Sequence, residues 1–302
     1  MKASVLHEYG GPSVMHYEDY PDPAPGPGEV LVQIAAAGIN PIDIAERSGG
    51  TKDWRPLRFP AVIGRDLSGT VVRLGPGVAD LAVGDRVCAW AEHTYAELCT
   101  ASSALFAKVP VDMDLADAAA LPLVGVTGSQ LISLAAGVTS GQTVLVSGAV
   151  GGVGRSAVFT AKKLGATVIA GVTGRQLDEA KRIGADRVVA LDDDTVFAAI
   201  PQVDVVANTV RGKTAEQLMG KVKPGGTFAS VTGAPANAKD YPKVKVVPFV
   251  SKQDKTTMSA IIEAVRAGKL AIPISQRVPL RDAAKGMAAV EAGSGGKVIL
   301  QP

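Results

Sequence analysis

The residues best suited to chemistry form a glycine-rich turn between an apolar run and an amphipathic stretch. Residues 143–147 read Thr-Val-Leu-Val-Ser, and residues 148–154 read Gly-Ala-Val-Gly-Gly-Val-Gly. Apolar residues then recur at helical spacing up to Leu164, and Gly165 is a natural helix stop. A strand, a glycine turn and a helix predict a dinucleotide site, because glycines let the backbone approach a pyrophosphate and a helix N-terminus offers free N–H groups. The alternative is an ordinary structural turn.

The turn departs from the full Gly-x-Gly-x-x-Gly spacing, because Ala149 stands at the first glycine position. Gly151 and Gly154 occupy the other two positions. The residues of this turn that we expect to contact a bound dinucleotide are Ser147, Ala149, Gly151, Gly152 and Val153.

The end of the next expected strand bears on which dinucleotide binds. Folds that prefer NAD place an acidic residue there, about 20 residues past the turn, to accept the ribose hydroxyls. This chain has Thr173, Gly174 and Arg175, and no carboxylate before Asp178. A hydroxyl and a guanidinium suit a 2′-phosphate, so we expect NADPH. The alternative for Arg175 is a solvated side chain at a helix start.

The composition limits the remaining chemistry. A formal charge of +2 without a basic cluster predicts no nucleic-acid partner. The only cysteines, Cys88 and Cys99, cannot form a four-thiolate zinc site or a disulfide framework, which favours a reducing, cytoplasmic location. The N-terminus lacks the features of a signal peptide, and we find no apolar run of membrane-spanning length, so we expect no membrane partner.

The elements that must position these residues fall into two regions with different secondary-structure patterns. Residues 1–117 are rich in short strands separated by Pro and Gly turns, whereas residues 118–254 alternate between strand and helix. This alternation predicts a doubly wound parallel sheet with helices on both faces. We expect strands over 143–147, 166–172, 187–191, 203–208, 226–231 and 243–250, and helices over 117–136 (interrupted at Pro122), 155–164, 176–183, 214–222 and 255–267.

The C-terminal run 296–300, Gly-Lys-Val-Ile-Leu, has no sheet of its own and should pair back with the N-terminal β-rich domain. We therefore predict an α/β fold in which a nucleotide-binding domain, residues 118–254, is inserted in a β-rich domain of residues 1–117 plus 255–302. Ligand sites favour the carboxyl ends of parallel strands and the cleft between domains.

Seven motifs in this order resemble the zinc-independent quinone oxidoreductases of the medium-chain dehydrogenase/reductase superfamily, the group that includes zeta-crystallin. The resemblance covers essentially the whole chain and implies a GroES-like domain, a Rossmann domain and a nicotinamide cofactor. Ala149 then matches the Ala-x-Gly-Gly-Val-Gly variant of the zinc-free reductases. The seven motifs lie at residues 36–43 (AAGINPID), 64–71 (GRDLSGTV), 83–87 (VGDRV), 95–97 (YAE), 120–127 (ALPLVGVT), 149–154 (AVGGVG) and 296–300 (GKVIL).

The resemblance also bears on metal binding. Zinc-dependent relatives carry a cysteine in the loop where this chain has residues 39–43, and a histidine–glutamate pair where it has Arg65 and Asp66. Catalytic zinc needs three protein ligands, and a cluster of Cys88, His93 and Cys99 is the only conceivable alternative. We expect no metal, and hence reduction of a substrate that is already electron-poor, such as a quinone or an enone.

The resemblance places Asn40 and Asp43 beside the nicotinamide, where Asn40 could hydrogen-bond a substrate carbonyl. The alternative is Asx-turn chemistry, which we favour for Asp43 and weigh equally for Asn40. Thr127 is similar to the family threonine that approaches the nicotinamide; its alternative is a helix hydroxyl bonded to its own backbone. The topology places three further cofactor contacts at the ends of the fifth and sixth strands, namely Thr232, Gly233 and Phe249.

Two positions depart from the family pattern. Many quinone reductases carry a tyrosine where this chain has Ala45, which opens the pocket, removes a phenol and puts small-quinone specificity in doubt. Relatives often end the fourth strand with aspartate, whereas this chain has Asn208.

The favoured function is an NADPH-dependent reductase that transfers hydride to a quinone or an α,β-unsaturated carbonyl compound. The alternative is a non-enzymatic NADPH-binding protein of crystallin-like or regulatory type. The apolar run 243–250 reads as an edge strand that needs a partner, so we also expect a homodimer.

Overall fold

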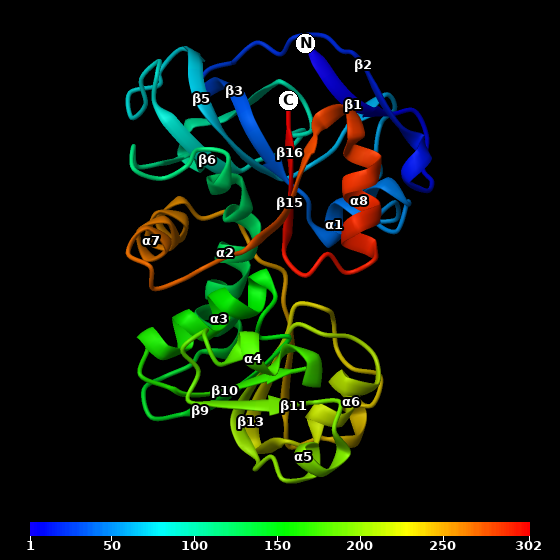
Figure 1. Ribbon diagram of the computed structural model, residues 1–302, viewed down its shortest axis with the longest axis vertical. Coiled ribbons are helices and arrows are strands. Elements are labelled where there is room, and N and C mark those ends of the chain that lie inside the picture. Colours follow the sequence, from blue (N-terminus) through cyan, green and yellow to red (C-terminus); the bar gives the residue numbers. More distant parts are fainter. The chain divides into compact units, whose positions relative to one another are not determined.

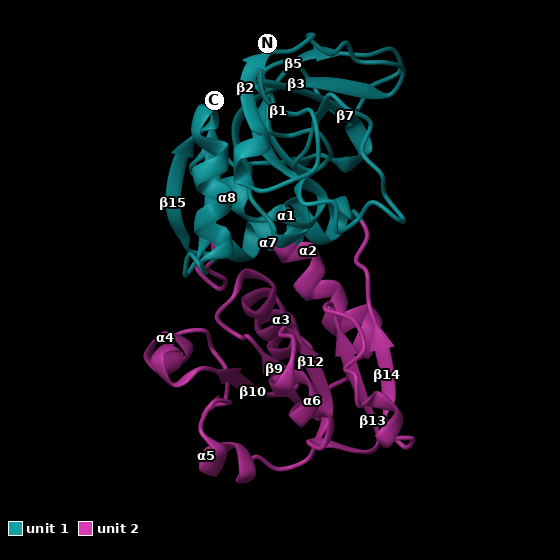
Figure 2. Ribbon diagram, turned by 90° about the vertical axis from the view of Figure 1, so that its right-hand side faces the viewer, with its two compact units in different colours: residues 1–123, 253–266, 272–302 teal, residues 124–252, 267–271 magenta.

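The computed structural model describes residues 1–302, which form two compact units (Figures 1 and 2). Unit 1 comprises residues 1–123, 253–266 and 272–302, and unit 2 comprises residues 124–252 and 267–271. The units thus change after residues 123 and 252, where the sequence suggested 117 and 254. Both termini belong to unit 1 (Figure 2).

Unit 2 contains a single sheet in which all neighbouring strands are parallel. Its strands are β9 (Thr143–Ser147), β10 (Thr167–Val172), β11 (Arg187–Ala190), β12 (Val203–Asn208), β13 (Val222–Ser230) and β14 (Lys245–Pro248). The order β11-β10-β9-β12-β13-β14 reads 3-2-1-4-5-6 when the strands are numbered along the unit. This is the order of a Rossmann fold, and the expected doubly wound sheet is confirmed.

Two apolar cores cover the two faces of this sheet. Val144 and Val146 of β9 pack into one core, and Leu145 between them packs into the other, because side chains alternate along a strand. All three are fully buried, and each contributes about 1.5–3 kcal/mol to stability. The helices of this part of the chain are α2 (Pro122–Gln130), α3 (Gly152–Lys163), α4 (Leu177–Ala180), α5 (Asp194–Ala198) and α6 (Lys213–Met219).

The helices differ from the sequence prediction mainly in length. Pro122 restarts the chain as α2 after a 3-10 turn, as expected, and a π-helical segment, Leu131–Ala136, follows α2. The helix expected over 176–183 is only the four residues of α4. The helix expected to reach residue 222 ends at Met219, because Val222 already begins β13.

Unit 1 contains two sheets, one of three strands in the order β2-β1-β4 and one of seven strands. The larger follows the order β15-β16-β3-β5-β6-β8, with β7 also paired to β3. The strands are β1 (Lys2–Leu6), β2 (Met15–Asp19), β3 (Glu29–Gly38), β4 (Ala61–Val62), β5 (Asp66–Leu74), β6 (Arg86–Trp90), β7 (Leu98–Ser102), β8 (Ala107–Lys108), β15 (Ile274–Pro279) and β16 (Lys297–Gln301). The helices are α1 (Pro41–Arg47), α7 (Lys255–Arg266) and α8 (Ala283–Glu291).

The C-terminal strand joins the N-terminal domain, as the sequence predicts. β16 runs antiparallel to β3, with Ile299 opposite Gly38 and Leu300 opposite Ala37. Sequence reasoning expected short strands in unit 1 but no helix α1 or α8 and no strand β15, because each of these is short or lacks a clear periodic pattern. In Figure 1, α8 lies beside β16 and α1, and its buried Met287 belongs to the same core as Leu300 of β16.

The segment 117–136 is long and apolar enough to cross a membrane by length and composition, so the expectation that no run reaches that length was wrong. However, 78% of its most apolar window is buried inside the protein, where it contributes Leu131 and Ile132 to the core of unit 2. The run therefore has the burial of a core helix.

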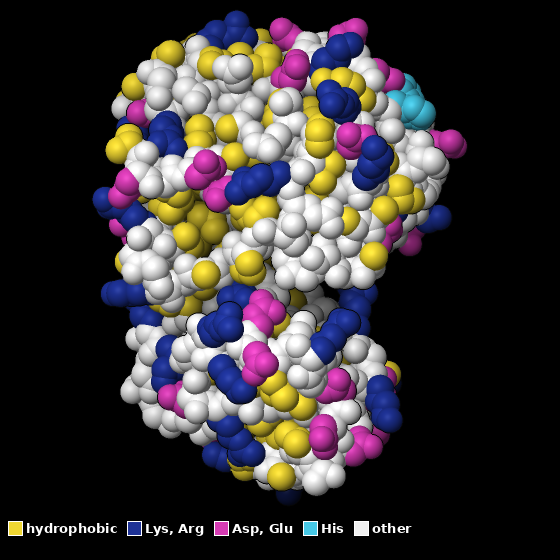
Figure 3. Space-filling view, viewed as in Figure 1, with side chains coloured by type: hydrophobic (Ala, Val, Ile, Leu, Met, Phe, Trp, Pro, Cys, Tyr) yellow, Lys and Arg dark blue, Asp and Glu magenta, His cyan; other side chains and the backbone are white.

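Charged side chains of both signs are interspersed on the face of the molecule that Figure 3 shows. This mixture agrees with a chain that carries 31 Lys and Arg residues against 29 Asp and Glu residues.

Candidate active site

The glycine turn of unit 2 leaves the first backbone N–H groups of α3 free. Gly148 carries the positive φ of +62° that turns the chain sharply after β9, and an added Cβ there would lie 2.4 Å from Thr209 Oγ1. Gly151 caps α3 with no side-chain hydrogen bond, so residues 152–154 keep N–H groups without an intrahelical acceptor. Their partial positive charge suits a phosphate. Thus Gly148, which sequence reasoning left out, makes the tight turn in place of Ala149.

Gly154 has the packing role of the last glycine in such a turn. A Cβ on Gly154 would lie 2.2 Å from the carbonyl oxygen of Gly148 and 2.7 Å from Cα of Ala149. The helix and the turn can therefore approach closely only with glycine at this position. Four of the six residues 149–154 are glycine or alanine, and the other two are Val150 and Val153.

Asn208 joins the carboxyl ends of β9, β12 and β13. Its Oδ1 accepts a hydrogen bond from Ser147 Oγ at 2.8 Å, and its Nδ2 donates to the carbonyl of Val210 at 2.8 Å and to Ser230 Oγ at 3.0 Å. Thr232 Oγ1 donates to the same Val210 carbonyl. A carboxylate could not donate to a carbonyl, so aspartate could not replace Asn208 in this network. Ser147 is thereby a buried part of this network.

The loop after β10 presents an exposed guanidinium. Thr173 hydrogen-bonds Gln176 through its backbone N–H and its hydroxyl, and the N–H of Gly174 donates to Asp192 Oδ1 at 2.7 Å. Arg175 is exposed and makes no hydrogen bond or ion pair. Its charge is therefore available to a ligand. Asp192, which sequence reasoning missed, lies beside the same loop.

The remaining expected cofactor contacts have defined surroundings in unit 2. Thr127 bonds the hydroxyl of Ser251 at 2.7 Å, so the side chain is held by a partner far along the chain. Gly233 has a φ of +92° and is exposed. Phe249 packs against the core, and its N–H donates to the carbonyl of Ser230. Their contacts with a cofactor stay predictions.

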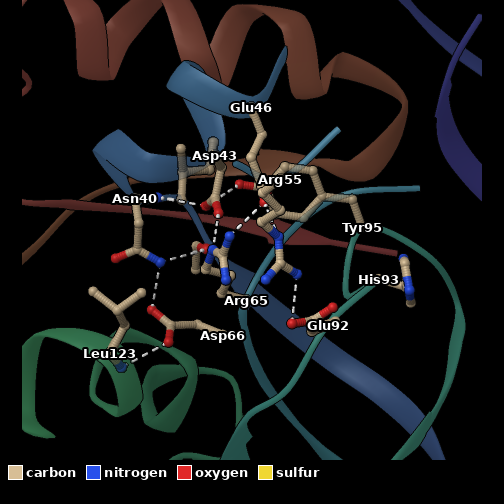
Figure 4. Close-up of polar contacts among 12 residues, drawn as sticks. Asn40, Asp43, Glu46, Arg55, Arg65, Asp66, Glu92, His93, Tyr95 and Leu123 are labelled. Atoms are coloured by element: carbon tan, nitrogen blue, oxygen red, sulfur yellow. Dashed lines mark hydrogen bonds and ion pairs between the residues drawn. The ribbon is translucent and has the colours of Figure 1, made fainter. Parts of the chain in front are cut away.

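In unit 1, Asn40 lies in a buried polar cluster with Asp66 and Lys297, part of which Figure 4 shows. Asn40 Nδ2 donates to Asp66 Oδ2 at 2.9 Å and makes a longer, 3.4 Å contact with the carbonyl of Gly38. Lys297 Nζ donates to Asn40 Oδ1 at 2.8 Å, to Asp66 Oδ2 at 3.0 Å and to the carbonyl of Ile39 at 3.0 Å. Sequence reasoning singled out neither Asp66 nor Lys297 for a role, although both belong to family motifs.

Asp43 holds the start of α1. Its Oδ2 accepts the backbone N–H of Asn40 and the hydroxyl of Tyr95, each at 2.8 Å, whereas its Oδ1 has no hydrogen-bond partner (Figure 4). Burial raises the pKa of Asp43 to about 7, and the hydrogen bonds from Tyr95 and Asn40 only partly oppose this rise. Arg65 lies 3.7 Å away, too far for a hydrogen bond.

A chain of ion pairs continues from this carboxylate to the surface. Arg65 pairs with Glu46 of α1, Arg55 pairs with the same carboxylate at 2.7 Å, and Arg55 also reaches Glu92 at 2.5 Å (Figure 4). Glu46 and Arg65 are buried, so each charge needs its partner. The pairs fix α1 to the loop before β5 and to the loop after β6.

Both predicted catalytic residues, Asn40 and Asp43, are therefore fully buried in one polar region. Asn40 is the N-cap residue of α1, and its side chain bonds Lys297 and Asp66. Asp43 does cap the helix, in agreement with the structural alternative for it. The part that either residue takes in a reaction stays a prediction.

The donors at the positions of the zinc ligands do not fit zinc. Asn40 Oδ1 and Asp66 Oδ2 converge on the ammonium group of Lys297, and Arg65 stands where zinc relatives have histidine. No group of three His, Cys, Asp or Glu side chains in the chain has a suitable arrangement for a metal ion. Burial also raises the pKa of the thiols of Cys88 and Cys99, which disfavours the thiolate that zinc requires.

Comparisons with known proteins agree with this architecture. A model of the alcohol dehydrogenase GroES-like domain matches residues 26–109, and a zinc-binding dehydrogenase model matches residues 183–300. A chloroplast envelope quinone oxidoreductase homolog of Arabidopsis thaliana is 29% identical over 326 residues, covering 100% of this chain and 98% of the relative. The 2-haloacrylate reductase of a Burkholderia species is 28% identical over 309 residues, covering 93% of each chain.

Solved structures also match the whole chain. An NAD-dependent alcohol dehydrogenase has a TM-score of 0.89 and 30% identity, and a mycobacterial protein in complex with NADPH has a TM-score of 0.87 and 31% identity. Each match covers 100% of both chains. The chain therefore belongs to the medium-chain dehydrogenase/reductase superfamily, in its quinone oxidoreductase branch. It is an oxidoreductase whose fold binds a nicotinamide cofactor.

The buried carboxyl of Asp43 generates a prediction about stability and pH. The pKa of this carboxyl is about 7 in the folded protein, against 3.8 for an unperturbed aspartate, so the folded state binds the proton more tightly than the unfolded state. The stability that the bound proton contributes is therefore complete below pH 4 and is lost as the pH rises to 7. This loss corresponds to about 4 kcal/mol. Asp43→Asn keeps both accepted hydrogen bonds and cannot ionise, so its free energy of unfolding should fall less between pH 4 and pH 7 than that of the wild type.

Urea unfolding at several pH values measures this difference. Asp53→Asn, at an exposed position in the loop before β4, is the matched control and should follow the wild-type curve. Parallel pH curves for Asp43→Asn and the wild type would contradict the raised pKa.

Proposed function

We propose that the protein is an NADPH-dependent reductase that transfers hydride to a quinone or an α,β-unsaturated carbonyl compound without zinc. The observation that carries this proposal is the ammonium of Lys297, which lies where Asn40 and Asp66 direct their oxygen atoms. A site of this kind offers no Lewis acid to polarise an alcohol or an unactivated carbonyl. Its substrate must therefore be an acceptor that is electron-poor by its own structure.

The loop after β10 supports the proposed preference for NADPH. Arg175 is exposed and unpaired beside the Thr173 hydroxyl, so it can form charge-assisted hydrogen bonds to a 2′-phosphate. Asp192 is a carboxylate that contacts this loop, because its Oδ1 accepts a hydrogen bond from the N–H of Gly174. The mycobacterial relative solved with NADPH supports the same choice, whereas the relative described as NAD-dependent makes it a matter for experiment.

The nicotinamide supplies the hydride when it is bound, and the residues of unit 1 orient and polarise the acceptor. One Nδ2 hydrogen of Asn40 is held by Asp66, and the other makes only the 3.4 Å contact with Gly38. The N–H group of that second hydrogen can donate a hydrogen bond to the oxygen of the acceptor, where negative charge develops during hydride addition. Because Asn40 is fully buried, this contact requires a local movement of its loop.

The product must also gain a proton, and we propose that it comes from solvent. Asp43 and Tyr95 are the titratable groups nearest to Asn40 on the α1 side, but both are fully buried and bonded to each other. Burial also raises the pKa of Tyr95 far above its ordinary value, which makes it a poor acid.

Ala45 bears on the acceptor class. It is a small, partly buried residue in the middle of α1, and the N–H of Gly50 donates to its carbonyl at 2.7 Å. The absence of a larger side chain leaves room for a substituted acceptor. The relatives are described as acting on quinones and on a 2-haloacrylate, which are both electron-poor and conjugated. A reductase for such acceptors agrees with both descriptions.

An acceptor panel tests the proposed function. Loss of NADPH absorbance is followed with quinones, 2-alkenals, enones, 2-haloacrylate and a simple alcohol–ketone pair, each with NADPH and with NADH. We expect turnover with conjugated acceptors and none with the alcohol–ketone pair, and no change after treatment with a zinc chelator. Tight NADPH binding without turnover on any acceptor would favour the non-enzymatic NADPH-binding protein instead.

Arg175→Ala tests the cofactor assignment. We expect the KM for NADPH to rise roughly 10- to 150-fold while the KM for NADH stays nearly constant, because one charge-assisted contact to a phosphate is worth roughly 1.5–3 kcal/mol. Arg187→Ala, at the exposed start of β11, is the matched control for removal of a surface charge from the same unit. An unchanged ratio of the two KM values would exclude Arg175 from recognition of the 2′-phosphate.

We also propose a homodimer formed along the outer edge of β14. This strand is the last of the parallel sheet and pairs only with β13, so its outer edge is unpaired within the chain. It is shorter than the run expected from the sequence, and Pro248 at its end has no N–H to donate.

The mass of the protein in solution tests this proposal. Light scattering after gel filtration should give the mass of two chains for the wild type. Val246→Pro, which removes an N–H from this strand, should give the mass of one chain. A wild-type monomer at micromolar concentration would contradict the proposal.

A further inference from the structure

Lys297 is the first residue of β16, and its side chain points into unit 1. It is 7% exposed, although an isolated ammonium group is among the least tolerated groups in a protein interior. The lysine belongs to the C-terminal motif Gly-Lys-Val-Ile-Leu, to which the proposed reaction assigns no task. The burial of the Lys297 ammonium group therefore has to be explained by the groups that surround it.

Three acceptors surround this ammonium, which matches its three N–H donors. They are the carbonyl of Ile39 at 3.0 Å, Asn40 Oδ1 at 2.8 Å and Asp66 Oδ2 at 3.0 Å. The strand register explains the arrangement, because the antiparallel pairing of Ile299 with Gly38 brings Lys297 opposite Asn40. Asp66 is fully buried and supplies the opposite charge.

We propose that Lys297 is a positioning residue that sets which way the Asn40 amide faces. The two ends of an asparagine amide have nearly the same shape, so packing alone does not decide between them. An ammonium group can only donate, and it therefore holds Oδ1 of Asn40. Nδ2 must then face Asp66 and Gly38, and its second hydrogen becomes the donor that the proposed reaction uses.

Asp66 makes this orientation firmer. Its Oδ2 accepts from both Lys297 and Asn40, and its Oδ1 accepts the backbone N–H of Leu123 at 2.8 Å, at the start of α2 (Figure 4). A carboxylate at a helix N-terminus is stabilised by the helix dipole, and here both of its oxygens accept hydrogen bonds. Both neighbours of the Asn40 amide are thus fixed in kind: a donor on one side and an acceptor on the other.

This inference rests on the proposed function, since the orientation of Asn40 matters for rate only if Asn40 contacts the acceptor. The first variant is Lys297→Ala. We expect kcat with the best acceptor to fall roughly 100-fold, which is the cost of a misplaced catalytic group, while the KM for NADPH stays within about 2-fold because the nucleotide cradle lies in unit 2. Lys285→Ala, an exposed lysine of α8 paired with Asp282, is the control and should keep wild-type kcat.

Chemical rescue distinguishes positioning from a loss of fold. In Lys297→Ala the three oxygen acceptors remain, so added methylammonium should restore about 10-fold of the lost kcat, whereas tetramethylammonium, which has no N–H, should restore none. The Tm of Lys297→Ala is measured with both salts at equal ionic strength. A folded variant with wild-type kcat would overturn the proposal, and so would equal effects of the two salts.

A double-mutant cycle tests whether Lys297 acts through Asn40. Asn40→Ala and Asn40→Ala/Lys297→Ala should have kcat values within about 2-fold of each other, because the group that Lys297 orients is already missing. Fully additive losses would overturn the proposal. If the wild-type protein turns over no acceptor, the proposed function fails; the orientation of Asn40 is then read from its side-chain amide NMR signals, which should shift in Lys297→Ala and return with methylammonium.

Discussion

The structure of unit 1 depends on the pairing of charges that are removed from water. Lys297 and Asp66 are buried together, and Glu46 is buried between Arg65 and Arg55. A single charge of this kind costs several kcal/mol, so each group fixes the position of its partner. The partners come from segments that are distant in sequence, which makes these pairs the links between β16, α1 and the start of β5. The position of Asn40 is a consequence of this arrangement.

In unit 2 the buried polar side chains at the strand ends are neutral, and they satisfy one another by hydrogen bonds. The carboxyl ends of its parallel strands carry Ser147, Asn208 and Ser230, which bond to one another beneath the glycine turn. These side chains both donate and accept, so the network satisfies its buried polar groups without a buried charge.

The sequence predicted the parts of the fold that follow from local patterns. The glycine turn, the alternating strands and the return of the last strand to the first domain were all expected, because hydrophobic periodicity and glycine positions report directly on backbone geometry. Helix α1 was not expected: its residues read as a turn, and burial against Met287 and Glu291 through Arg47 supports a helix of only seven residues. The role of Gly148 in place of Ala149 also needed φ values that no spacing rule supplies.

The sequence by itself determined the class of protein, because the glycine turn and the family motifs are local features that tolerate few alternatives. Only the tertiary structure decided what surrounds Asn40. The residues that hold it, Asp66 and Lys297, are 26 and 257 positions away along the chain. Their contact depends on the register between β16, β3 and β5, which arises from the packing of the whole sheet. A buried lysine and an exposed one look the same in a sequence, and only burial gives Lys297 its partners.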